Sequence, residues 1–356
     1  MKNWLFGIEE WPPHNRVAET QKSIEVINVA DQFGWESTTE QVLAGIDLTG
    51  KTIVVTGGSA GLGVETGRAL CAAGADLVMV GRDAGKMAAA KDVVVGARAG
   101  ASVSSYLMDL ANLESVREAG SKIAAKHPRV DVLVNNAGVM ACPFLKTDDG
   151  FEMQFGTNHI GHFEFTRQLL PSLTTSGARV VNLSSAGHKY SDIVFDDIHF
   201  AHRDYDKWSS YGQSKTANML FSVELTRRYA AQGIYSNAVH PGVIMTDLSR
   251  HLTEEDIAAM ASRRKSSDAK GEDKPADRPS SSGMKLKSLE QGAATSVWAA
   301  TSDVFEQRGG LYLENCQIGE PERDNMGIGY KPYAVDTETA ARLWEVSEQL
   351  TGSTWG

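Results

Sequence analysis

A tyrosine and a lysine four positions apart, Tyr211 and Lys215 in YGQSK, form the pair in this sequence best suited to moving a proton. An apolar, helix-like run, TANMLFSVEL, follows them closely. Residues four apart lie on one face of a helix, so both side chains would point into a common space. Tyrosine has a pKa near 10 and is a poor base at neutral pH unless nearby positive charge favours its phenolate. The pair predicts either an acid–base site in which Lys215 supplies that charge, or a chance pairing on a solvated helix.

The segment KTIVVTGGSAGLG, at 51–63, predicts an element that holds phosphate groups. Its β-branched run is typical of a strand buried on both faces, and the following VETGRALCAAGA has helical spacing. Gly57, Gly61 and Gly63 would let the backbone turn and approach the phosphates closely. The helix N-terminus would then offer free N–H groups to a pyrophosphate. A merely tight turn is the alternative, but the strand before and the helix after favour a dinucleotide site.

Composition limits the classes of function. The chain has 356 residues, 42% of them apolar, which is enough to bury a large α/β core. The formal charge of −10 argues against general binding of nucleic acid or of an anionic membrane. The three cysteines are too widely spaced for a metal site, and no run approaches the roughly 20 apolar residues of a membrane span. We therefore expect a cytoplasmic protein that binds neither nucleic acid nor a metal ion.

Several further motifs follow in an order typical of one enzyme superfamily. After TGGSAGLG come Asp109-Leu110, the NNAG run at 135–138, Asn158 in TNHIGHF, Ser184-Ser185 at the end of RVVNLSS, YGQSK, and HPG at 240–242. Over roughly residues 46 to 350 the chain resembles the short-chain dehydrogenase/reductase superfamily, in its compact branch. The resemblance implies a doubly wound α/β fold, a Rossmann fold with a mostly parallel sheet flanked by helices. It also implies NAD(P)-dependent oxidoreductase activity on an alcohol or its carbonyl compound.

The resemblance assigns roles to four catalytic residues. Tyr211 exchanges a proton with the substrate oxygen while hydride passes between the substrate carbon and the nicotinamide. Ser185 holds the same oxygen, with the adjacent Ser184 as the alternative. Lys215 also grips the nicotinamide ribose, and Asn158 anchors a water that links Lys215 to solvent. The implied cofactor contacts are Gly57, Ser59, Ala60, Gly61, Leu62, Gly63, Arg82, Asp109, Leu110, Asn136, Ala137, Gly138, Tyr211, Lys215, Pro241, Gly242, Val243 and Thr246.

The motif variants indicate a branch of this superfamily. The separation from Ser185 to Tyr211 is about twice that of many members, so the residues between them form an insertion. TNHIGHF, SSAGHKY, FDDIHF and EQGAATSVWAAT resemble the retinol-dehydrogenase-like branch, which includes 17β-hydroxysteroid dehydrogenases and acts on bulky apolar alcohols and ketones. Several relatives carry an N-terminal membrane anchor, which we do not expect here. A steroid-like or aromatic secondary alcohol is the expected substrate, with a retinoid or another aldehyde as the alternative.

The end of the second predicted strand, LVMVGRD, bears on the choice of cofactor. An NAD enzyme usually places an acidic residue there to bind the adenine ribose, whereas this chain has Gly81 followed by Arg82. A guanidinium pairs well with a phosphate, so NADP is favoured and NAD is the alternative. Arg82 could instead pair with Asp83 or stack on the adenine.

Some conspicuous residues are expected to have structural roles. Cys142 is predicted to be a small buried residue, and His188 and His240 to be structural or pocket-lining rather than metal ligands. Trp208 either borders the pocket or packs within the inserted loop. A non-catalytic dinucleotide sensor and a structural interaction protein are the alternative functions, although a sensor has no need of all four catalytic groups.

The chain is divided into an N-terminal extension, 1–45, and one Rossmann-fold catalytic domain, 46–356. The extension is too aromatic for a plain flexible tail and is expected to pack on the core or on another subunit of a homo-oligomer. A substrate loop is expected at about 246–290, with a flexible insert at 262–283 whose composition cannot build a core. GGLYLENCQIGEP predicts a last strand, and TETAARLWEVSEQL predicts a closing helix.

Overall fold

The computed structural model describes residues 32–256, 286–323 and 327–355. The insert predicted at 262–283 and most of the predicted N-terminal extension lie outside these residues. Within the described part of the chain, no helix is long and apolar enough to cross a membrane.

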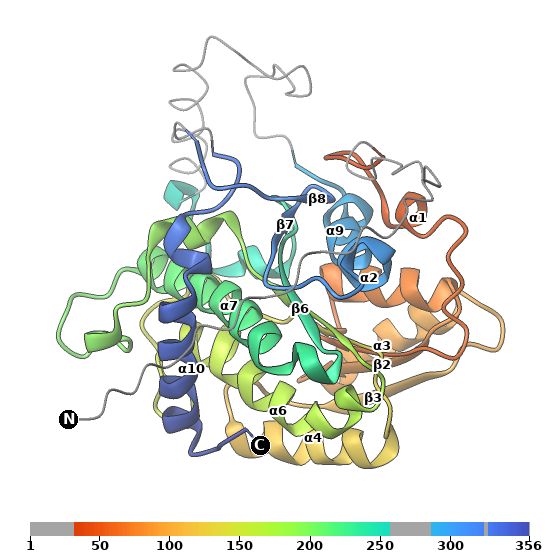
Figure 1. The fold of residues 1–356 in the computed structure, drawn as a ribbon, viewed down its shortest axis with the longest axis horizontal. Helices are drawn as coiled ribbons and strands as arrows, with labels where there is room; N and C mark the ends of the chain where they lie inside the picture. The colour runs from red at the N-terminus through yellow and green to blue at the C-terminus, as the bar shows by residue number, and fades with distance from the viewer. Residues whose placement is uncertain (1–31, 257–285, 324–326, 356) are drawn as a thin grey trace, which may run out of the picture.

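The centre of the molecule is an eight-stranded sheet in the order β3-β2-β1-β4-β5-β6-β7-β8 (Figure 1). All neighbouring strands run parallel except β7 and β8, which are antiparallel. The order reverses between β1 and β4, which creates a crevice at the carboxyl ends of the strands where α/β proteins bind ligands. This is the doubly wound Rossmann fold that the sequence predicts. The strands are β1 (Thr52–Thr56), β2 (Asp76–Gly81), β3 (Val103–Leu107), β4 (Val132–Asn135), β5 (Arg179–Leu183), β6 (Tyr235–His240), β7 (Tyr312–Glu314) and β8 (Gln317–Ile318).

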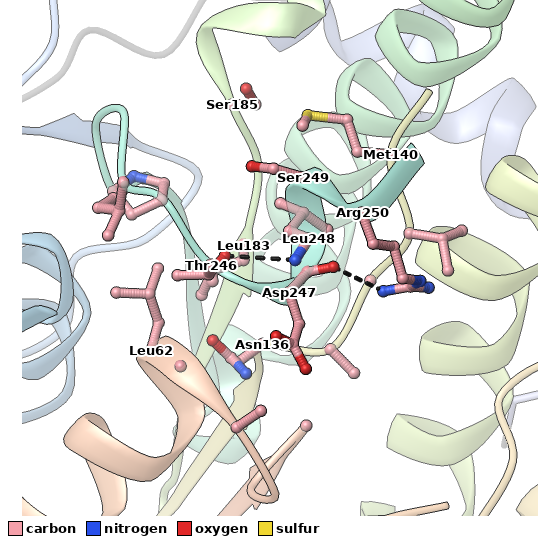
Figure 2. A pocket seen from close by; sticks show the side chains of 18 of the residues that line it. Leu62, Asn136, Met140, Leu183, Ser185, Thr246, Asp247, Leu248, Ser249 and Arg250 are labelled. Carbon is pink, nitrogen blue, oxygen red and sulfur yellow. Dashed lines mark hydrogen bonds between the residues drawn. The ribbon is translucent and has the colours of Figure 1, made fainter. Parts of the chain in front are cut away.

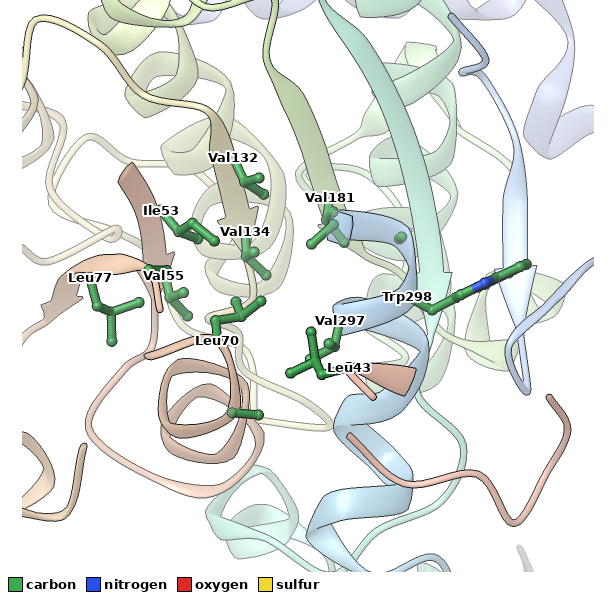
Figure 3. Packing of buried hydrophobic residues seen from close by; sticks show 14 of the residues in the cluster. Leu43, Ile53, Val55, Leu70, Leu77, Val132, Val134, Val181, Val297 and Trp298 are labelled. Carbon is green, nitrogen blue, oxygen red and sulfur yellow. The ribbon is translucent and has the colours of Figure 1, made fainter. Parts of the chain in front are cut away.

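The central strands are buried on both faces because helices cover both sides of the sheet. Successive side chains of β1 alternate, so Ile53 and Val55 pack on one face and Val54 on the other. Figure 3 shows the first of these clusters, in which the strand residues meet Leu70 and Val297 from two helices.

Three helices, α2 (Gly61–Ala72), α3 (Ala84–Val95) and α9 (Leu289–Thr301), supply the apolar residues of that face. The opposite face is covered by α4 (Leu113–Lys126), α6 (Gly161–Thr174) and α7 (Lys207–Tyr229), with the predicted closing helix α10 (Thr337–Thr351) contributing Trp344. The short α1 (Thr39–Val42), within the predicted extension, packs on the first face through Val42. In the described part of the chain, the remaining short helices are α5 (Met153–Phe155), η2 (Gly156–Ile160), η3 (Ala186–Tyr190), η4 (Phe195–Asp197), η5 (Ala230–Gln232), η6 (Asp247–His251), η7 (Asp303–Phe305) and η8 (Pro332–Val335).

The prediction of a single last strand in GGLYLENCQIGEP is wrong. The segment forms the two antiparallel strands β7 and β8. Asn315 and Cys316 between them have φ of 53° and 55°, in the left-handed region. Two consecutive residues in that conformation turn the chain back on itself. The residue types there did not reveal the turn, since cysteine seldom adopts this conformation.

Three buried histidines make stability depend on pH. Burial lowers the pKa of His159 to about 3 and those of His162 and His188 to about 4. In the unfolded chain each would have a pKa near 6.5 and bind a proton more readily. Stability should therefore fall as the pH decreases from 6.5 towards 4, by about 1.4 kcal/mol per pH unit for each histidine.

Thermal unfolding measured across this pH range should show a melting temperature that decreases steadily with acidification. A His159→Gln variant, which removes one of the three buried rings, should show a shallower dependence than the unmodified protein. Equal dependence in the two proteins would contradict the contribution assigned to His159.

Candidate active site

A cavity of about 480 Å³ lies at the carboxyl ends of the central strands, at the crevice where the strand order reverses. Its walls come from segments far apart in the sequence. Figure 2 shows Leu62 at the start of α2, Asn136 after β4, Ser185 after β5, and the Thr246–Arg250 segment after β6 gathered around it. The cavity therefore joins the glycine-rich turn and the serine motif in one space.

The glycine-rich turn between β1 and α2 has no room for a side chain at Gly57, where a Cβ atom would lie 2.8 Å from Asn136 Nδ2, or at Gly63. Gly57 and Gly61 have φ of 67° and 54°, which other residues rarely adopt. A Cβ atom on Gly63 would lie 2.7 Å from Asn136 Nδ2 and still closer to the Gly57 carbonyl oxygen. The turn therefore requires glycine at Gly57 and Gly63 and favours it at Gly61, as the sequence indicates.

The N-terminus of α2 suits an anionic ligand. Its first residue is Gly61 and its N-cap is Ala60, and no side chain among the described residues caps it. The first amide groups of a helix have no partner within the helix, and the helix dipole adds partial positive charge there. Ala60, Gly61 and Leu62 line the cavity, so the uncapped end faces ligand space. The residues present therefore fit the pyrophosphate of a dinucleotide.

Tyr211 and Lys215 occupy the first half of α7, which begins at the N-cap Asp206, whose carboxylate accepts from Ser209 N at 2.7 Å. Both side chains are 4% exposed, and both line the cavity. Lys215 Nζ lies 5.6 Å from the centre of the Tyr211 ring and donates to the Leu183 carbonyl oxygen at 2.9 Å. The helical spacing thus places the two groups together, and the alternative of a solvated helix face is wrong.

Burial dominates the protonation of this pair. It raises the pKa of Tyr211 to about 12, while a hydrogen bond with Ser185 acts in the opposite direction. Burial also lowers the pKa of Lys215 to about 7. Desolvation disfavours the charged form of both groups, and stabilisation of the phenolate by the Lys215 charge stays a prediction. At neutral pH the structure holds Tyr211 as a phenol, ready to donate its proton.

The two adjacent serines have different surroundings. The Ser184 hydroxyl is buried and donates to the Lys215 carbonyl oxygen at 2.9 Å, so it fastens β5 to α7. The Ser185 hydroxyl caps η3 by accepting from Gly187 N at 3.0 Å and also bonds Tyr211. This arrangement favours Ser185 as the serine that acts with Tyr211.

Asn158 lies in the π-helix η2 behind the cavity and is fully buried. Its side chain accepts from Val139 N at 2.8 Å and donates to Val139 O and Ser214 Oγ, both at 2.9 Å. These bonds tie the loop after β4 to α7. Anchoring of a water by Asn158 stays a prediction.

Most of the predicted contact residues surround the cavity. Gly63 and Asp109 do not line it, and neither does Asn158. Gly63 packs beneath the turn, and the Asp109 carboxylate accepts from Ala111 N at 2.9 Å. The predicted residues that line the cavity are Gly57, Ser59, Ala60, Gly61, Leu62, Arg82, Leu110, Asn136, Ala137, Gly138, Ser185, Tyr211, Lys215, Pro241, Gly242, Val243 and Thr246.

An apolar wall of the cavity was predicted only in part, through Trp208 and the substrate loop expected at about 246–290. The Trp208 ring lies 5.8 Å from that of Tyr190, and both residues line the cavity. Of the two positions predicted for Trp208, the structure shows the one at the border of the pocket. The wall's other members are Met140, Ile244, Met245, Leu248 and Leu252. Leu248 lies in the short helix η6 and the others lie in loops, where no periodic pattern marks the residues that face a ligand.

Basic side chains lie at another part of the cavity wall, after β2. Arg82 is exposed, and Lys86 of α3 pairs with Asp247 of η6 at 3.0 Å. The Asp83 carboxylate accepts from Lys86 N at 2.9 Å and caps α3. No ion pair joins Arg82 to Asp83 within the described residues, so Arg82 is not neutralised by that neighbour.

The remaining conspicuous residues have structural surroundings. Cys142 is buried, as predicted, and burial raises the pKa of its thiol to about 11. His240 lines the cavity, whereas His188 is buried outside it. Among the residues that the structure describes, no group of three or more histidine, cysteine or acidic side chains could hold a metal ion.

The fold and the cavity define a dinucleotide-binding protein of the Rossmann class, and similarity to known proteins then places it in a family. Residues 51–257 match the short chain dehydrogenase family. The chain therefore belongs to the short-chain dehydrogenase/reductase family of NAD(P)-dependent oxidoreductases, in its retinol-dehydrogenase-like branch.

Three relatives illustrate the similarity. Retinol dehydrogenase 13 of Homo sapiens is 38% identical over 306 residues, covering 86% of each chain. A probable oxidoreductase of Streptomyces lividans is 42% identical over 305 residues, 84% of this chain and 97% of that one. The short-chain dehydrogenase/reductase prx1 of Penicillium roqueforti is 37% identical over 309 residues, 84% of each chain.

Solved structures agree with the fold. A putative uncharacterised protein from Mycobacterium paratuberculosis has a TM-score of 0.65 and 31% identity, covering 88% of this chain and 98% of that one. The Pseudomonas aeruginosa RhlG/NADP complex has a TM-score of 0.57 and 24% identity over 75% of this chain and 95% of that one, which shows the fold alone.

Proposed function

We propose that this protein transfers hydride between NADP and a bulky, apolar secondary alcohol or its ketone. One observation carries the proposal: the Ser185 and Tyr211 hydroxyls and the Lys215 ammonium group border the same cavity as the uncapped N-terminus of α2. One part of the cavity thus suits a dinucleotide, and another suits proton transfer.

In the direction of carbonyl reduction, a nicotinamide dinucleotide held at the N-terminus of α2 would supply the hydride. Tyr211 gives its proton to the substrate oxygen, which its raised pKa favours because the phenol is the populated form at neutral pH. Ser185 donates a hydrogen bond to the same oxygen and orients it. Lys215, held by the Leu183 carbonyl oxygen, stabilises the phenolate that remains. Addition of the hydride to the carbonyl carbon and of the proton to its oxygen gives the alcohol.

The substrate class follows from the apolar wall. Trp208, Tyr190, Met140 and Met245 offer aromatic and flexible thioether surfaces but few hydrogen-bonding groups. Such a wall suits a steroid-like or aromatic scaffold. A retinoid is the second candidate, supported by the names of the human relatives retinol dehydrogenases 13 and 14. Comparing kcat/KM for a steroid ketone and for retinal would separate the two.

We base the proposed preference for NADP on the positive charges of Arg82 and Lys86, which lie beside the end of β2. An Arg82→Ala variant should bind NADPH about 10- to 100-fold more weakly, because a charge-assisted hydrogen bond contributes about 1.5–3 kcal/mol. Its affinity for NADH should change little. Fluorescence titration of both reduced cofactors would measure this. Arg323→Ala, which removes an exposed arginine outside the cavity, is the control. Equal losses for NADPH and NADH in Arg82→Ala would contradict the assignment.

The division into an N-terminal extension, 1–45, and one catalytic domain, 46–356, is likewise proposed. Val42 and Leu43 of the extension pack into the same apolar cluster as α2 and α9, which supports an extension that lies against the core. The substrate loop is proposed to begin near Thr246, since η6 lines the cavity. A cytoplasmic location and a homo-oligomeric state stay predictions.

Transfer of deuterium tests the proposed reaction. The protein would be incubated with NADPH deuterated at C4 and with a panel of bulky ketones and retinal. Mass spectrometry should find deuterium on the carbinol carbon of the product. Cofactor binding without deuterium transfer to any carbonyl compound would favour the dinucleotide-sensor alternative.

A further inference from the structure

The turn that carries Ser185 is fastened to the C-terminal part of the chain through the ring of His188. His188 Nδ1 lies 2.7 Å from the Ser185 carbonyl oxygen, and Lys331 N donates to Nε2 at 3.2 Å. The ring is fully buried and does not line the cavity. Its two nitrogens therefore bridge the serine turn to a segment nearly 150 residues further along the chain.

The partners determine the state of the ring. A carbonyl oxygen only accepts, so Nδ1 carries the hydrogen, and a backbone N–H only donates, so Nε2 is bare. The ring is consequently neutral and has one fixed tautomer. Its low pKa, caused by burial, agrees with this assignment.

Tyr333 and Glu322 also hold the same two segments together. The His188 carbonyl oxygen accepts from Tyr333 Oη at 2.9 Å. Glu322 pairs with Lys189 at 3.2 Å and with Lys331 at 2.7 Å, and the Glu322 side chain is only 7% exposed. We call Glu322, Lys331 and Tyr333 the C-terminal clasp. These three residues contact His188 and Lys189, which follow shortly after Ser185.

We propose that His188 is a positioning residue for the reaction: with the C-terminal clasp, it holds the Ser185 backbone so that the Ser185 hydroxyl meets Tyr211 and the substrate oxygen. This rests on the proposed function of Ser185. The Ser185 hydroxyl accepts from Gly187 N, within the same turn, so a displaced turn would carry the hydroxyl with it. A displacement of this kind at a reacting group can lower the rate about 100-fold.

Two substitutions of His188 test its two hydrogen bonds one at a time, because each can keep only one of them. His188→Asn can place an amide N–H near the former Nδ1 and keep the bond to the Ser185 carbonyl oxygen. His188→Gln can place its amide oxygen near the former Nε2 and keep only the bond from Lys331 N. We expect kcat to fall at least tenfold in His188→Gln and no more than about threefold in His188→Asn. The Kd for NADPH should stay unchanged in both, because His188 does not line the cavity.

A readout without turnover accompanies the kinetics. Hydrogen exchange of the peptide containing residues 184–190, measured without cofactor, should be faster in His188→Gln than in His188→Asn. A Tyr333→Phe variant, which leaves the ring in place and removes one bond of the clasp, should also exchange faster there than the unmodified protein. His127→Gln, which alters a half-buried histidine bonded to Tyr106 at the sheet edge, is the control for general loss of stability.

Equal kcat and equal exchange in His188→Asn and His188→Gln would overturn the proposal, as would a loss of kcat in His127→Gln matching that in His188→Gln. If the unmodified protein turns over no substrate, the proposed function fails. The exchange of residues 184–190 then still decides whether His188 positions the serine turn.

Discussion

Replacing Tyr211 by phenylalanine is expected to lower kcat for carbonyl reduction by about 10²- to 10⁴-fold, the range typical for loss of a general acid. The substitution removes the proton that balances hydride transfer. It removes only one oxygen from a side chain that is 4% exposed, so the ring can keep its packing on α7. The Kd for NADPH should change little, because the uncapped N-terminus of α2 is untouched.

Single-turnover kinetics with a ketone in excess would measure this effect on the chemical step. Tyr229→Phe is the matched control, because Tyr229 lies on the same helix, is also buried and does not line the cavity. The control should keep the kcat of the unmodified protein. A Tyr211→Phe protein with near-normal kcat would mean that another group donates the proton.

A methyl group added at Gly63 should have the second largest effect, on cofactor binding. The new Cβ of Gly63→Ala would overlap the Gly57 carbonyl oxygen and crowd Asn136 Nδ2, so the turn between β1 and α2 must shift. Forced overpacking of this kind costs about 1–3 kcal/mol, which corresponds to about a 5- to 150-fold weaker Kd if it is expressed in binding. Binding of NADPH and of NADH should weaken alike, because the turn faces the pyrophosphate group, which both cofactors contain.

Calorimetric titration of NADPH into the variant would measure the change in affinity. Gly34→Ala is the control, because Gly34 has ordinary φ and nothing within 4 Å of the position of a Cβ. Unfolding temperatures of both variants would show how much of this free energy appears as lost stability of the folded protein rather than as weaker binding. A Gly63→Ala protein that binds NADPH as tightly as the unmodified chain would contradict the close packing of the turn.

The parts of the site that sequence predicts are those determined by local geometry. The turn at 57–63 follows from glycine conformations, and the common orientation of Tyr211 and Lys215 follows from helical spacing. The burial of β1 on both faces follows from its run of β-branched residues. In each case a few neighbouring residues contain the relevant information.

Features that depend on tertiary packing could not be predicted in this way. The pKa directions of Tyr211 and Lys215 are set by burial, which depends on the surrounding loops as much as on α7. The apolar wall combines residues such as Met140 and Leu252, which lie over 100 positions apart in the sequence. The bond from Lys331 to His188 joins two segments with no common motif.

Participation of Tyr211 in hydride transfer to a carbonyl compound is the claim on which the proposed function depends most directly. We would follow the absorbance of NADPH with the purified full chain, a panel of steroid ketones, aromatic ketones and retinal, and Tyr211→Phe beside every assay. We predict oxidation of NADPH that requires the carbonyl compound and nearly disappears in the variant. Oxidation at the same rate in both proteins, or tight binding of NADPH with no oxidation across the panel, would contradict this role of Tyr211.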